Sequence, residues 1–150
     1  MKNTIFFAGT ACLLAACNSI SVKPETMITN QTVYADRGGF GMKRSIKNEL
    51  ERRGYKVVVG KAVSAREIDI ESPRIPGNAR YYVHVSERDE KFRPVWCALN
   101  GVWWWNFNAS IADQKTGEEL MTWRGRGCAD SSMRLLRKTL DKLEKENGKQ

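Results

Sequence analysis

The chain has 150 residues, of which 41% are hydrophobic and 28% are charged. This length suits one domain with a buried core and is too short for two domains of ordinary size. Lysine and arginine (25) exceed aspartate and glutamate (17), which gives a formal net charge of +8. Because the basic residues are scattered among acidic ones, we interpret them mainly as a solvated surface, and no nucleic-acid partner is expected.

The first sixteen residues have the pattern of an export signal. Lys2 precedes an apolar run over residues 4–16 that is too short to span a bilayer as a permanent helix. The run ends in the sequence LAAC, which resembles the lipobox of bacterial lipoproteins. The resemblance implies a signal peptide over residues 1–16, cleavage before Cys17, and acyl chains such as palmitate on the sulfur and new amino group of Cys17. Two or more chains would anchor the protein durably in the lipid bilayer. Two alternatives stay open, namely an ordinary secretory signal that leaves Cys17 free, and a buried N-terminal helix.

The residues after Cys17 bear on localisation. In enteric-type sorting an aspartate at the next position holds lipoproteins in the inner membrane, so the resemblance and Asn18 imply the outer membrane, at its periplasmic face. Residues 17–31 are polar and lack a sustained periodicity, and we expect a lipidated N-terminus and flexible tether there. A single periplasmic domain should then occupy residues 32–150. A basic domain in this compartment meets phospholipid headgroups, lipopolysaccharide phosphates and peptidoglycan carboxylates.

The cysteines divide into three groups. Cys12 leaves with the signal and Cys17 is assigned to the anchor, which leaves Cys97 and Cys128 in an oxidising compartment. We expect a disulfide between these two; a pair of buried free thiols is the alternative. A hairpin after Cys97 would separate the two cysteines by an intervening strand, too far for a disulfide, so we expect residues 92–101 to form a loop. Two cysteines and one histidine without close spacing do not make a zinc site, and neither a metal nor a cofactor is expected.

A helix and a strand are predicted after a short extended piece at residues 32–35. Apolar residues recur at every fourth position of residues 42–53, and Gly54 supplies a C-terminal stop. The β-branched run at residues 55–59 predicts a strand. The glycines before the helix lack the lysine spacing of a phosphate-binding loop, so we interpret them as a helix entry.

After a turn-rich stretch, residues 80–86 alternate and predict a half-buried strand. Tyr81, Val83 and Val85 share one face, and His84 lies on the other, more polar face. Catalysis would require a nucleophile and an orienting partner within hydrogen-bond reach of His84, and the sequence identifies neither. We interpret His84 as an exposed strand residue.

An aromatic run at residues 102–112 predicts a second, longer strand. Alternation puts Trp103 and Trp105 on a face that we interpret as core, while Trp104 lies among polar neighbours on the opposite face. For Trp104, core packing and ligand binding are both open interpretations.

A hairpin turn at residues 113–117 should lead into a returning strand that ends near Arg126. If Asp113 faces Gly117, then Phe107 faces Trp123. In the same register Trp104 faces Arg126, where a cation–π contact could form.

The last predicted element is a helix. Residues 130–132 offer capping side chains, and an apolar stripe follows from Met133 to Leu143. We expect this helix to pack on the sheet; membrane or partner-helix binding is the alternative. The order of elements predicts an α+β fold, with a mainly antiparallel sheet and two helices packed on one face.

Two further stretches carry a loose family resemblance. GYKVVV after a helix and ADQKTGEELMTW across a hairpin resemble small α+β envelope lipoproteins and, more distantly, the lipopolysaccharide-assembly lipoproteins of the LptE family. The lipobox, the tether and the lack of a catalytic constellation together favour a non-enzymatic binding or accessory subunit in outer-membrane or envelope assembly, with an envelope protein as partner. A binder of anionic envelope glycan (lipopolysaccharide or peptidoglycan) that uses Trp104 and Arg126 is the alternative. A periplasmic hydrolase that uses His84 is a third hypothesis.

Overall fold

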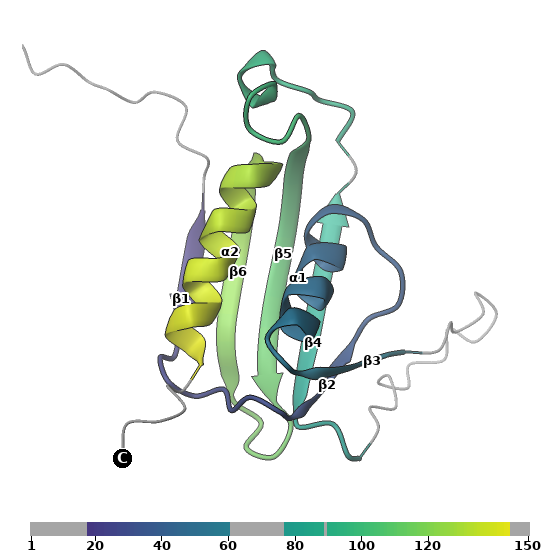
Figure 1. Cartoon of the computed structure of the whole chain (residues 1–150), viewed down its shortest axis with the longest axis vertical. Coiled ribbons are helices and arrows are strands. Elements are labelled where there is room, and N and C mark those ends of the chain that lie inside the picture. The colour runs from purple at the N-terminus through teal and green to yellow at the C-terminus, as the bar shows by residue number, and fades with distance from the viewer. Residues whose placement is uncertain (1–17, 61–76, 89, 145–150) are drawn as a thin grey trace, which may run out of the picture.

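The computed structural model describes residues 18–60, 77–88 and 90–144. The predicted signal peptide, Cys17 and most of the turn-rich stretch before residue 77 lie outside the described residues. A mixed six-stranded sheet carries two helices on one face (Figure 1). This arrangement confirms the predicted α+β fold with both helices on the same side.

The described residues form nine elements. In chain order they are β1 (Ser19–Val22), β2 (Thr32–Ala35), α1 (Gly41–Arg52), β3 (Lys56–Val59), β4 (Tyr81–Arg88), the 3-10 turn η1 (Val95–Cys97), β5 (Trp104–Asp113), β6 (Glu119–Cys128) and α2 (Ala129–Leu143). The strand order is β1-β6-β5-β4-β2-β3. β2 is parallel to β3 and β4, and the other neighbours are antiparallel.

Residues 18–31, which the sequence assigns to a flexible tether, are instead built into the domain. β1 pairs antiparallel with the edge of β6. The backbone N–H groups of residues 25–27 donate to carbonyls in the last turn of α2, and Met27 is fully buried. The polar composition hides this role because a short edge strand needs few inward apolar side chains. Here Ile20 and Val22 supply them by packing against the core.

The long hairpin of β5 and β6 forms as predicted, but with the pairing shifted by two residues. Phe107 lies opposite Gly125 instead of Trp123, and Ala109 lies opposite Trp123. A β-bulge after Ile111 contributes to the shift. Because a shift of two residues leaves every side chain on its original face, Trp123 is still in the core, with 1% of its surface exposed.

α2 begins before the predicted capping residues. Its first residue follows β6 directly, and no side chain caps its N-terminus. The hydroxyl of Ser131 donates to the carbonyl oxygen of Cys128 at 2.9 Å instead of accepting a bond from a helix N–H group. The predicted apolar stripe does pack on the sheet, since Leu136, Leu140 and Leu143 are fully buried.

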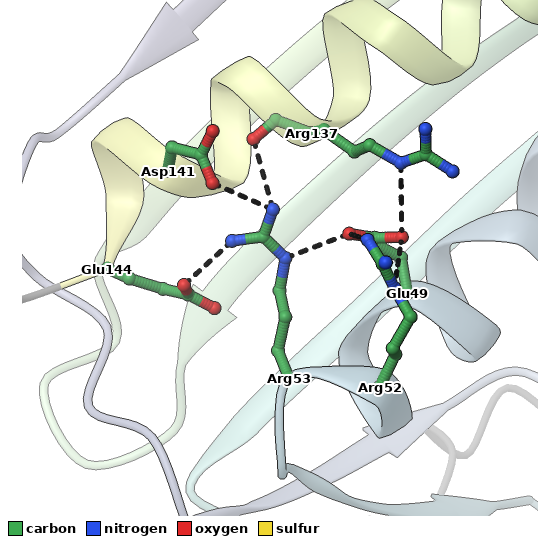
Figure 2. A network of polar contacts seen from close by, with 6 residues as sticks. All are labelled: Glu49, Arg52, Arg53, Arg137, Asp141 and Glu144. Carbon is green, nitrogen blue, oxygen red and sulfur yellow. Dashed lines mark hydrogen bonds and ion pairs between the residues drawn. The ribbon is translucent and has the colours of Figure 1, made fainter.

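A network of charged side chains joins the C-terminal ends of the two helices (Figure 2). The side chain of Glu49 in α1 is only 3% exposed and accepts hydrogen bonds from Arg52 Nη2 (2.6 Å) and Arg53 Nε (3.1 Å). Arg53 also reaches across to α2, where it pairs with Asp141 and Glu144 at 2.8 Å each. Burial acts to raise the pKa of Glu49, but the donors from Arg52 and Arg53 outweigh it, so this pKa lies below its usual value.

Replacing Arg53 by methionine should destabilise the domain. The Arg53→Met change removes the cation shared by Glu49 and Glu144 and leaves their carboxylates in a poorly hydrated contact between helices. We expect the free energy of unfolding in urea to fall by about 2 kcal/mol. The control is Arg124→Met, because Arg124 is exposed and donates only an exposed side-chain hydrogen bond, to Asn108, so its removal should cost at most ~0.5 kcal/mol. Equal losses for the two variants would contradict the central role of Arg53.

Candidate functional site

A groove of about 980 Å³ lies between the beginning of α1 and the beginning of β5. One wall holds three consecutive tryptophans, Trp103 to Trp105, and the other holds Phe40 and Arg44 of the helix entry. Further cationic side chains from the end of β4 and the loop after it, including Arg88 and Arg93, also line the groove. Stacking surface and positive charge therefore occur together, a combination suited to sugar rings that carry anionic groups.

The helix entry is shaped by a carboxylate and a glycine. Glu87 at the end of β4 accepts hydrogen bonds from the backbone N–H groups of Lys43 (2.6 Å) and Phe40 (3.2 Å). Gly41 has φ +49°, and a Cβ there would lie 3.1 Å from the indole nitrogen of Trp105. Gly41, the first residue of α1, thus serves the predicted helix entry and also lets Trp105 approach the helix.

Trp104 and Arg126, the predicted surface-binding pair, are brought together through a third residue. The register shift puts Arg126 opposite Asn106 and Trp104 opposite Cys128, so the expected direct pairing is wrong. Glu90 joins them, since its carboxylate takes hydrogen bonds from Asn106, Arg126 and Trp104. The bond from Asn106 lowers the pKa of Glu90 most; burial opposes it, and Arg126 and Trp104 add to the lowering.

Trp103 differs from its predicted position in the core. β5 begins at Trp104, two residues later than predicted, so Trp103 lies outside the alternating pattern and is 54% exposed. The guanidinium of Arg93 lies over its ring, 4.0 Å from the centroid. A cation–π pair therefore exists in this region, with Arg93 and Trp103 in place of Arg126 and Trp104. Trp105 follows the prediction more closely and packs against the core.

Cys97 and Cys128 form a disulfide, with their Cα atoms 5.4 Å apart. Cys97 lies in the 3-10 turn η1 and Cys128 ends β6, so the bond ties a loop to the start of α2. This geometry agrees with a loop, and not a strand, over residues 92–101. Neither sulfur is available for metal binding. Among the described residues, no three His, Cys, Asp or Glu side chains gather in a way that could hold a metal ion.

His84 has a partner that the sequence did not reveal. It is exposed on the sheet face away from the helices, and its Nδ1 lies 2.6 Å from Asp36 Oδ2. The hydroxyl of Tyr82 donates to the other oxygen of Asp36, and burial together with this carboxylate raises the pKa of Tyr82 to about 12. Ser110 is the neighbour of His84 across β4 and β5. Asp36 was missed because it lies 48 residues before His84 and is placed by the parallel pairing of β2 with β4. Its position directly after a strand was the available signal.

The comparisons with known proteins bear on the fold. No protein-family model and no curated protein sequence matches the chain. No helix in the described ranges is long and apolar enough to cross a membrane. Two similar solved structures are both of the PelC dodecamer from Paraburkholderia phytofirmans, one of them a single-substitution variant. The alignment with the variant has 12% sequence identity and covers 88% of this chain and 99% of the PelC chain. The alignment with the other structure has 14% identity and covers 87% of this chain and 100% of the PelC chain. Both have a TM-score of 0.51, so this chain shares the fold of PelC over nearly the whole length of both proteins.

Proposed function

We propose that this chain is a membrane-anchored envelope lipoprotein that acts as a non-enzymatic subunit of a multi-copy assembly at the outer membrane. The observation that carries the proposal is the end-to-end likeness to a protein solved as a dodecamer. The lipobox before Cys17 supports the anchor. An envelope protein partner, expected from the sequence, is part of the proposal. The more distant resemblance to the LptE family is not needed for it.

The chemistry of the groove supports a binding role over a catalytic one. The two carboxylates that line the groove already accept hydrogen bonds within the protein. Glu87 accepts them from backbone N–H groups at the start of α1, and Glu90 accepts them from the side chains of Asn106 and Arg126. Neither acid is placed as a free proton donor or acceptor toward a ligand. His84 and Asp36 lie on the open sheet face and do not line the groove.

The anchor predicts a defined mass for the mature protein. Cleavage before Cys17 and acylation of its sulfur and amino group should give an N-terminal peptide that carries a diacylglyceryl group and a further acyl chain. Intact-mass and peptide mass spectrometry of the protein isolated from membranes measures this directly. In the Cys17→Ser variant the modification should be lost. An unmodified residue at the mature N-terminus would contradict the anchor.

The assembly predicts an oligomer in solution. We expect the membrane-extracted protein to give a multiple of the monomer mass by native mass spectrometry and by light scattering after size exclusion. Gentle cross-linking before extraction should add a reproducible envelope partner. A monomer at every concentration tested, with no cross-linked partner, would refute this proposal while leaving the anchor result unaffected.

Binding of an anionic envelope glycan is the second candidate function, favoured by the aromatic and basic lining of the groove. The Trp104→Ala variant removes one of the three tryptophans in the groove wall and, with it, a hydrogen-bond donor to Glu90. Retention on immobilised peptidoglycan or delipidated lipopolysaccharide should weaken about tenfold, since one lost stacking contact accounts for that much. Tyr82→Ala is the control because Tyr82 is a partly exposed aromatic on the open sheet face that does not line the groove. Unchanged retention of Trp104→Ala would remove this candidate.

A further inference from the structure

We propose that residues 92–103, here called the apolar loop, form an interfacial membrane-binding element that inserts side chains into the surface of an anionic bilayer. The described residues expose nine large hydrophobic side chains, and six of them belong to this loop: Phe92, Val95, Trp96, Leu99, Val102 and Trp103. Leu99 is 100% exposed and Val95 is 85% exposed. Such a concentration of apolar surface at one place marks a contact surface, because scattered single residues would need no explanation.

The backbone of the apolar loop is held firmly although its side chains point outward. The disulfide fixes Cys97 to Cys128, and the N–H group of Val102 donates to the carbonyl of Cys97 at 2.8 Å. At the start of α2, the N–H group of Ala129 donates to the carbonyl of Trp103 at 2.9 Å. The apolar side chains are therefore displayed from a fixed scaffold, which reduces the entropy lost when they enter a bilayer.

The residue types and charges of the loop fit a lipid surface. Tryptophan prefers the boundary between headgroups and acyl chains, and Trp96 and Trp103 are each about half exposed. Lys91 and Arg93 are exposed at the base of the loop, and Arg134 of α2 donates to its Asn100 at 3.3 Å. Apolar side chains at the tip with cations behind them match the order of acyl chains and anionic headgroups in a membrane.

The position of the loop agrees with the proposed lipid anchor. Ser19, the first residue of β1, lies opposite Arg124 of β6. Arg124 comes four residues before Cys128, where β6 ends, and four residues of strand span about 13 Å. The start of β1 and the apolar loop thus lie at the same end of the sheet (Figure 1). This part of the inference rests on the proposed function, because a lipid on Cys17 would bring that end to the bilayer. The exposed apolar surface itself does not depend on the anchor.

The test uses residues 18–150, which contain every described element and the disulfide but no lipidation site. Binding is measured by co-sedimentation with vesicles of phosphatidylethanolamine and phosphatidylglycerol, and with neutral phosphatidylcholine vesicles for comparison. We expect binding to the anionic vesicles and a blue shift of tryptophan fluorescence. Leu99→Asp should weaken this binding about tenfold or more, since it removes a fully exposed leucine from the membrane contact.

The matched control is Gln114→Asp, which adds the same charge at an exposed position in the β5–β6 turn, at the opposite end of the sheet. It should bind like the unaltered domain, and thermal unfolding should show that both variants are folded. Failure of the unaltered domain to bind anionic vesicles, or equal binding by Leu99→Asp, would overturn the proposal. The proposal would also be overturned if native mass spectrometry showed that the only effect of Leu99→Asp is to dissociate an oligomer of the chain, since the loop would then be a contact between subunits. Because no lipid is attached in this experiment, its outcome is independent of the mass measurement on Cys17.

Discussion

Arg53 is the cation on which the arrangement of the two helices depends. α1 and α2 end side by side, so the negative ends of two helix dipoles meet where Glu49 is buried and Glu144 is partly buried (Figure 2). Arg53 is only 15% exposed and bridges both carboxylates, so it replaces the water that they lose. With both helices fixed in this way, one face of the sheet is closed and the other face, with His84, is left open.

The molecule is consequently different at its two ends. At the hairpin end, the ion network, the buried side chain of Met27 and the pair between Arg80 and Asp113 (2.7 Å) hold several elements together. At the other end, the disulfide of Cys97 and backbone hydrogen bonds to the start of α2 connect the loop to the body of the domain. The groove and the apolar loop both lie at this second end. Surfaces available for partners are thus separated from the interactions that stabilise the fold, which allows them to vary without loss of the core.

The sequence predicted those features that depend on local periodicity. Alternation identified the buried face of β4 and kept Trp123 in the core even though the register of the hairpin was shifted, because a shift of two preserves the face. Features that depend on pairing between distant segments were not predictable in the same way. β1 looked like a tether because its partner is a hundred residues away, and Asp36 gained its role only through the pairing of β2 with β4. Trp103 was misplaced because periodicity does not say where a strand begins.

The ordered β1 also changes what an anchor at Cys17 would do. A tether of thirteen stretched residues would allow roughly 40 Å of separation and free rotation, whereas only Asn18 lies between Cys17 and β1. Anchoring would therefore fix which end of the sheet meets the membrane, and the groove would open near the headgroups. Phe92, the first residue of the apolar loop, connects the two surfaces, because its ring is edge-on both to Trp96 of the loop (centroids 6.1 Å apart) and to Trp104 of the groove (centroids 5.9 Å apart). A shift of the Phe92 ring on insertion of the loop would change its contact with Trp104 in the groove. Membrane contact and ligand binding at this end of the domain are therefore expected to influence each other.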